Sequence, residues 1–161
     1  MPSERLNLFT AELQHDGDDP EGYRAGYLRF GDSIGASMLG GTIYELEPGQ
    51  SNCPYHYEYG NEEWLVVLDG RLTLRTPEGE ETLEAGTVAC FAEGPEGAHK
   101  LQNRSDSTVR VLMLSTKRDP SVAVYPDSDK IGVWSGNDRD KLMARRESDV
   151  DYWTGELPDR P

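Results

Sequence analysis

The residues able to do chemistry in this 161-residue chain are concentrated between positions 48 and 70. His56, Glu58 and Glu63 are close together there, and His99 follows after a turn-rich stretch. Two imidazoles and two carboxylates suit a borderline or hard divalent ion. We therefore predict that these four residues bind a divalent metal ion, with zinc, manganese, iron and nickel all open as candidates.

The spacing of the four residues indicates on which strands they must lie to meet at one ion. Residues two apart on a strand share a face, so we expect His56 and Glu58 to project together. Glu63 follows a short turn and is expected on the neighbouring antiparallel strand, facing back toward the first two. His99 must come from a distant strand. Each residue alone is a weak candidate, because a lone histidine is more often a hydrogen-bonded core residue and a strand glutamate is often solvated.

The middle of the chain, residues 36–116, is a series of short apolar segments separated by turn residues. Strand-like segments occur at 44–46, 64–68, 72–74, 88–91 and 109–114. Short strands at this spacing predict an all-β sandwich or barrel. The run 64–68 is almost continuously apolar, which predicts a strand buried on both faces. Asp69-Gly70, which follows it, is a strong hairpin signal.

The flanks differ from this middle region within a predicted single domain of residues 1–161. We expect an N-terminal arm over 1–35, with a strand-like segment near 23–30, and a polar, irregular C-terminal arm over 117–161. Three aromatic residues lie in charged surroundings in that second arm: Trp134, Tyr152 and Trp153. Isolated aromatics in a polar arm usually fix it to a surface. We predict that the arm packs at the contact of a homodimer.

Composition excludes several classes of partner. The formal net charge of -14 disfavours binding to nucleic acid and to anionic lipid. No apolar run approaches the ~20 residues of a membrane span, and the first residues lack the pattern of a secretory signal. With Cys53 and Cys90 as the two cysteines, we expect a cytoplasmic protein with free thiols that takes a small-molecule ligand, without nucleic acid or membrane.

The spacing of these residues resembles the two motifs of the cupin superfamily, in its small single-domain form. The first motif is matched by Pro48-Gly49, His56, Glu58 at the position of a second histidine, Glu63 and Gly70. The second is matched by Gly86, Pro95-Glu96-Gly97, His99 and Asn103. The resemblance covers about one third of the chain. It implies a jelly-roll β-barrel that carries its metal inside.

The chain departs from the cupin pattern at two places. Glu58 replaces a histidine, so the usual ligand set of three histidines and one glutamate would become two of each. The segment before His99 is longer than the family pattern, and Ala92 stands where proline is usual. Without Glu58, the remaining His56, Glu63 and His99 would form a set of two histidines and one carboxylate, which suits non-haem iron.

The resemblance leaves the reaction open, because small cupins include sugar isomerases, decarboxylases, epimerases and dioxygenases. Our first hypothesis is an enzyme whose metal acts as a Lewis acid on a sugar or organic acid. Its catalytic residues are unknown. Tyr44 and Tyr59 are candidates for donating a proton or binding substrate, although such tyrosines more often serve in packing. The alternatives are a non-catalytic module that binds or senses a small ligand, and a jelly roll with a degenerate site.

Overall fold

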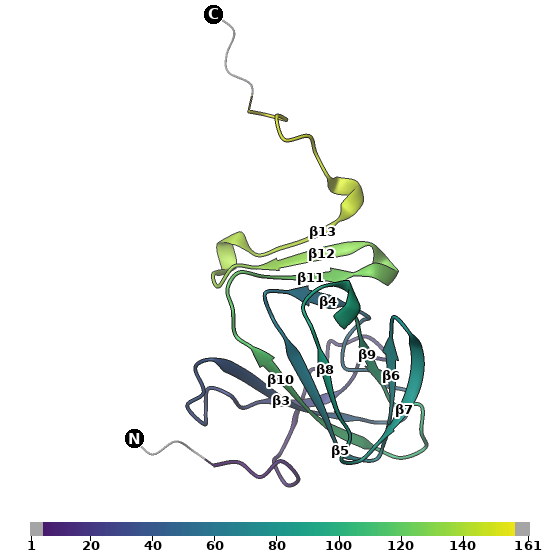
Figure 1. The fold of residues 1–161 in the computed structure, drawn as a ribbon. Coiled ribbons are helices and arrows are strands. Elements are labelled where there is room, and N and C mark those ends of the chain that lie inside the picture. Colours follow the sequence, from purple (N-terminus) through teal and green to yellow (C-terminus); the bar gives the residue numbers. More distant parts are fainter. Residues whose placement is uncertain (1–4, 157–161) are drawn as a thin grey trace, which may run out of the picture.

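The computed structural model describes residues 5–156, which form antiparallel sheets joined by turns and short 3-10 helices (Figure 1). The largest sheet has six strands, in the order β1 (Gln14–His15), β2 (Gly26–Arg29), β3 (Leu39–Leu46), β10 (Val109–Thr116), β5 (Glu63–Asp69) and β8 (Val88–Phe91). The predicted all-β fold is confirmed.

Two smaller sheets complete the fold. One contains β7 (Gly79–Glu84), β6 (Arg71–Thr76) and β9 (Lys100–Gln102). The other contains β13 (Leu142–Arg145), β12 (Lys130–Trp134), β11 (Ser121–Tyr125) and β4 (Tyr57–Tyr59), and it lies across one end of the other strands, at the top of Figure 1. The 3-10 helices are η1 (Pro95–Gly97), η2 (Pro126–Ser128), η3 (Asp138–Asp140) and η4 (Arg146–Ser148).

The main core lies between the six-stranded and the three-stranded sheets, as expected for a jelly roll. Leu65 and Val67 of β5 pack there with Leu72 of β6 and Leu101 of β9, and all four side chains are almost completely buried. A Cβ on Gly70 would lie 2.8 Å from the Thr108 carbonyl oxygen, so the predicted hairpin turn between β5 and β6 requires glycine. Among residues 5–156, no helix is long and apolar enough to cross a membrane.

A second apolar cluster covers the other face of the six-stranded sheet. Ile43 and Leu112 are its buried centre, and Val66 and Leu68 pack against them. Strand β5 thus packs against apolar residues on both faces, as predicted. Trp64 is the exception, because it is 45% exposed. The prediction of complete burial was wrong at this residue because Trp64 lies beside the exposed Cys90 of the edge strand β8.

The N-terminal region is more closely integrated than an arm. β2 pairs with β3, and Leu6, Leu8, Ala11 and Leu13 pack against the second cluster. Arg110 holds this segment in place: its guanidinium donates to the carbonyl oxygens of Leu8 (2.9 Å) and Ala11 (2.8 Å) and forms an ion pair with Glu45 (2.8 Å). The first four residues of the predicted arm lie outside the described residues.

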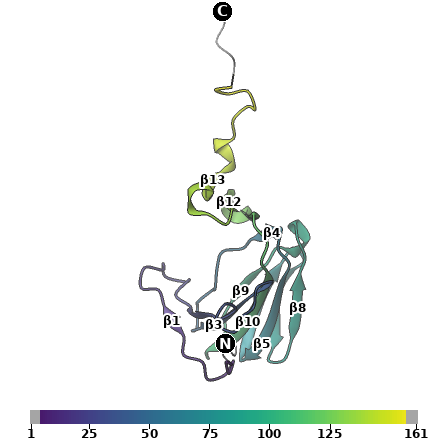
Figure 2. The ribbon, with the colours of Figure 1, turned by 90° about the vertical axis from the view of Figure 1, so that its left-hand side faces the viewer.

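The C-terminal region is strand rather than irregular chain as far as residue 145. The prediction of an irregular arm after Lys117 was wrong here because β11, β12 and β13 pair successively, and β11 also pairs with β4. Beyond β13 the chain runs away from the sheets (Figure 2). Tyr152 and Trp153 are 82% and 59% exposed and contact each other edge to face. The predicted homodimer contact stays a prediction, and residues 157–161 lie outside the described part.

Candidate metal centre

The two histidines of the predicted site lie opposite each other in an isolated antiparallel bridge. His56 precedes β4, and His99 follows η1. The His56 amide donates to the His99 carbonyl oxygen (3.1 Å), and the His99 amide donates to that of His56 (2.8 Å). Two residues 43 positions apart in the sequence are thus fixed side by side, with ring centroids 4.8 Å apart.

Glu63 completes the group from the first position of β5. One of its carboxylate oxygens lies 3.4 Å from Nε2 of His99 and 3.7 Å from Nε2 of His56. One ligand atom from each of the three residues lies within 4.8 Å of the other two. The structure therefore brings together three of the four predicted ligands, as two imidazoles and a carboxylate facing a common point.

The other ring nitrogens show which atoms are available to a metal. Nδ1 of His56 lies 3.0 Å from the Pro54 carbonyl oxygen, and Nδ1 of His99 lies 2.9 Å from that of Gly97. A carbonyl can only accept, so Nδ1 carries the proton in each neutral ring and Nε2 keeps its lone pair. Nε2 of His99 is buried and, among the described residues, has no hydrogen-bond partner. Such a buried acceptor fits a bound metal ion.

The electrostatics favour metal binding at two of the three residues, Glu63 and His99. Burial alone would raise the pKa of Glu63, but the neighbouring imidazoles of His56 and His99 hold it below its usual value. Burial lowers the pKa of His99 to about 4. For His56 burial acts in the same direction, but Cys53 and Glu63 outweigh it and raise the pKa. At neutral pH, Glu63 is therefore ionised and His99 is neutral, which are the forms that ligate metals. His56 is protonated in the metal-free protein and releases its proton when it ligates an ion.

Glu58, the fourth predicted ligand, lies outside this group of three. Its carboxylate accepts a hydrogen bond from the Asn61 side-chain amide (2.9 Å). Burial and the charge of Glu63 raise its pKa, so it lies close enough to the centre for electrostatic coupling. The expected hairpin between its strand and that of Glu63 was wrong, because β4 pairs with β11 whereas β5 pairs with β8 and β10.

The three ligands line a small cavity of about 100 Å³. Apart from Met113, its other walls are polar or small: Gly40, Thr42, Tyr44, Asn52 and Ser115. Tyr44 was one of the two predicted tyrosine candidates, and burial raises its pKa to about 12, so its hydroxyl stays protonated at neutral pH. The other, Tyr59, is 46% exposed and packs edge to face on Tyr57. Only Tyr44 of the two lines the cavity.

Two aromatic rings support the histidines and were not recognised in the sequence. Phe91 of β8 stacks on His99 with centroids 3.8 Å apart and an interplanar angle of 11°. Tyr125 of β11 stacks on His56 at 5.8 Å and 24°. Phe91 ends a strand that the sequence did predict. Tyr125 had no local signal, because its strand lies in the segment expected to be irregular.

The remaining polar residue of the second motif has a structural role. Asn103 is fully buried, and its side-chain amide donates to the carbonyl oxygens of Leu46 (2.7 Å) and Ser107 (2.8 Å). Its side-chain oxygen accepts hydrogen bonds from the backbone amide and the hydroxyl of Ser105. Asn103 thus fixes the turn that follows β9 and contributes no ligand to the group of three.

A barrel-like β-fold with an internal site of two histidines and one carboxylate defines the class of protein. Residues 42–115 match the family model described as a cupin domain. This segment is a cupin domain, as the two motifs implied, and the structural comparisons agree. Comparison with curated proteins gives no match.

Solved structures share the fold over most of the chain. A sugar phosphate isomerase of the cupin superfamily from Silicibacter pomeroyi is 26% identical, with a TM-score of 0.78 over 90% of this chain and 94% of that one. A protein from Acidithiobacillus ferrooxidans, provisionally named a sugar phosphate isomerase, is 21% identical, with the same TM-score over 89% and 91%. A polyketide cyclase from Streptomyces resistomycificus is 20% identical, with a TM-score of 0.58 over 73% and 82%. The last two show the fold alone.

Proposed function

We propose that this cupin is a divalent-metal-dependent enzyme acting on a small oxygen-rich molecule, most specifically a sugar phosphate isomerase. The observation that carries the proposal is the buried Nε2 of His99, which has no hydrogen-bond partner in the described part of the chain and faces Glu63 at 3.4 Å inside the cavity. Similarity to the isomerase from Silicibacter pomeroyi supports the choice of substrate class.

The residues present would hold the ion through Nε2 of His56, Nε2 of His99 and the carboxylate of Glu63. Glu58, which is coupled to Glu63 by charge, is proposed as the fourth ligand. Such an ion supplies Lewis-acid polarisation of a substrate carbonyl or hydroxyl oxygen. Manganese, iron, nickel and zinc all fit these donor atoms.

Beside the ion, the substrate would contact hydroxyl-bearing residues of the cavity wall. Tyr44 keeps its proton at neutral pH, so its hydroxyl can donate a hydrogen bond to a substrate oxygen. Thr42 and Ser115 offer further hydroxyls from the cavity wall, and Gly40 leaves space between them. Small hydroxyl-bearing walls suit a polyol better than an aromatic ligand.

Isomerisation assays on metal-loaded protein test the proposal. Aldose and ketose phosphates of three to six carbons are incubated with protein loaded with each of the four ions, and product sugars are separated by chromatography. We expect turnover that is lost on chelation and in Glu63→Gln, but kept in Glu84→Gln, which removes an equal charge from an exposed ion pair with Arg71. Saturable binding without turnover would favour a non-catalytic binding module. An ion-free protein would indicate a degenerate site.

A further inference from the structure

A second cavity of about 210 Å³ adjoins the metal cavity. Its walls are Asp16, Asp19, Tyr23, Ala25, Tyr27, Arg29, Tyr44 and Asn52. Tyr44 and Asn52 also line the metal cavity, so the two spaces share a wall. Only together do they reach the lower end of the ~300–1,000 Å³ typical of small-molecule pockets. A substrate larger than the metal cavity would therefore extend into this outer cavity.

The register of the six-stranded sheet places Arg29 on the same face as the metal ligand Glu63. Arg29 of β2 is paired with Thr42 of β3, Thr42 with Met113 of β10, and Met113 with Leu65 of β5. Leu65 is two residues from Glu63 and shares its face. Three strand spacings of ~4.8 Å put the two backbones ~14 Å apart across the sheet, a distance that both side chains shorten by reaching into the cavities.

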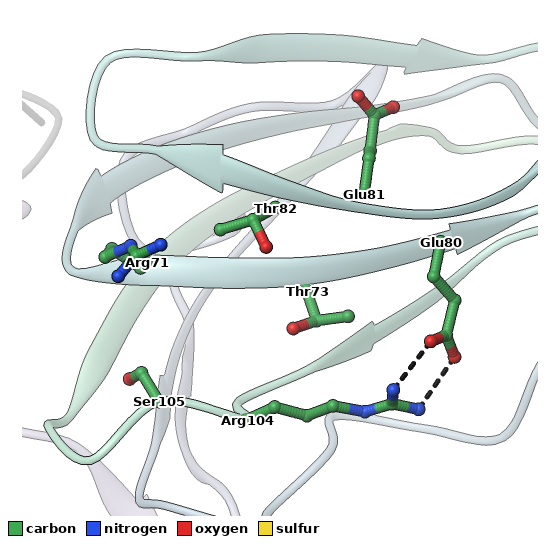
Figure 3. Close-up of a pocket in the computed structure, with 7 residues that line it drawn as sticks. All are labelled: Arg71, Thr73, Glu80, Glu81, Thr82, Arg104 and Ser105. Atoms are coloured by element: carbon green, nitrogen blue, oxygen red, sulfur yellow. Dashed lines mark hydrogen bonds and ion pairs between the residues drawn. The ribbon is translucent and has the colours of Figure 1, made fainter.

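Arg29 is a cation without a carboxylate partner among residues 5–156. Its guanidinium lies over the ring of Tyr27, 5.7 Å from the centroid, which orients it in the outer cavity. The contrast is a separate hollow of about 410 Å³ on β6 and β7, where Arg104 forms two bonds of 2.6 and 2.7 Å with Glu80 (Figure 3). With 30 acidic and 16 basic residues in the chain, an arginine that lies beside the metal cavity and has no ion pair within residues 5–156 points to an anionic ligand.

The wall shared by the two cavities carries polar atoms that could form hydrogen bonds with the middle part of such a ligand. Oδ1 of Asn52 is buried and has no hydrogen-bond partner among the described residues. It can accept a bond from a hydroxyl, and the Tyr44 hydroxyl can donate one. Asp16 and Asp19, also in the outer cavity, repel an anion but accept bonds from hydroxyls. The negative group of the ligand therefore belongs at Arg29.

We propose that Arg29 binds the anionic group of the substrate, a phosphate or a carboxylate, while the polyol passes Asn52 and Tyr44 to the metal cavity. This inference rests on the proposed function and names the residue that would bind the anionic group of its substrate. Arginine pairs with either anion through two parallel hydrogen bonds, which makes it a specific reader of such groups.

Binding of three hexoses to manganese-loaded protein tests the proposal by calorimetry. The probes are D-fructose 6-phosphate, D-glucuronate and neutral D-fructose. We expect one anion to bind at least ~10-fold more tightly than fructose, and this preference to fall ~10-fold or more in Arg29→Gln. Arg71→Gln, which removes an equal charge from the distant hollow of Figure 3, should leave the preference unchanged. Whichever anion is preferred identifies the group as phosphate or carboxylate.

Three results would overturn the proposal: no binding of either anion, no preference for either anion over fructose, or the same preference in Arg29→Gln. The metal content of each protein, measured in parallel, separates this failure from that of the proposed function. A metal-loaded protein whose anion preference ignores Arg29 disproves the anion site alone. An ion-free protein that still prefers an anion through Arg29 disproves the metal enzyme but keeps the site.

Discussion

Substitution of Gly97 by alanine should disturb the metal centre without changing any ligand. A Cβ at Gly97 would lie 1.8 Å from the carbonyl oxygen of Ala92. Real Cβ atoms are essentially never closer than 3.0 Å to such an atom, so η1 or the segment at Ala92 must move by at least 3.0 − 1.8 ≈ 1.2 Å. The Gly97 carbonyl oxygen accepts the bond that orients His99 (2.9 Å), so this movement reaches the ligand directly.

The expected loss follows from how little displacement a metal site tolerates. Ligand distances in metal sites hold to about 0.2 Å, far less than the required shift. Disturbing the partner that orients a ligating histidine typically lowers metal affinity ~10–100-fold, and overpacking costs ~1–3 kcal/mol of stability. We therefore expect Gly97→Ala to weaken metal affinity by at least ~10-fold and to lower the melting temperature.

Competition with a fluorescent chelator measures the affinity, and thermal unfolding measures the stability. Gly17→Ala is the matched control, because a Cβ there meets nothing within 4 Å. If Gly97→Ala binds metal within twofold of this control and melts at the same temperature, the account of how η1 positions His99 is refuted.

Three further predictions concern the ligands and their support. Glu58→Gln should reduce metal affinity less than Glu63→Gln in the same competition assay, because Glu58 is bonded to Asn61 and lies outside the group of three; an equal loss would contradict this ranking. In metal-free protein, burial lowers the pKa of His99 from 6.5 to about 4, so between these values the unfolded chain binds a proton that the folded chain does not. Stability should then fall as pH falls from 6.5 toward 4, by up to ~1.4 kcal/mol per pH unit, as measured by urea unfolding with chelator, and a similar slope in His99→Gln would exclude this cause. Asn103→Ala should cost ~3 kcal/mol of stability in urea unfolding, because it leaves buried carbonyl oxygens unpaired; a loss below ~1 kcal/mol would contradict its structural role.

The sequence predicted the fold of the middle region because its signals there are local. The apolar run of β5, the alternating residues of β6 and the Asp69-Gly70 turn between them define both strands without reference to distant parts of the chain. The flanks could not be predicted in this way. β11 has no partner near it in sequence except β12, and its pairing with β4 joins segments more than 60 residues apart. Likewise, Arg110 donates a hydrogen bond to the carbonyl oxygen of Leu8, which lies 102 residues earlier in the sequence.

The same limit applies to the candidate site. Spacing predicted His56, Glu63 and His99 correctly as a group, because the ligand chemistry and the two motifs constrain them together. The position of Glu58 depends on which strand β4 pairs with, and that pairing was not visible in the sequence. Arg29 lines the outer cavity, and its relation to Glu63 follows from a four-strand register that begins outside both motifs.

Elemental analysis of the purified protein shows whether His56, Glu63 and His99 hold a metal ion. Protein prepared without chelators is measured by mass spectrometry of its metals, beside His56→Ala, Glu63→Ala and the control Glu84→Gln. We expect about one divalent ion per chain in the parent and in Glu84→Gln, and loss of that ion in the two ligand variants. A parent protein without a divalent ion that also fails to bind added manganese, iron, nickel or zinc would contradict this expectation.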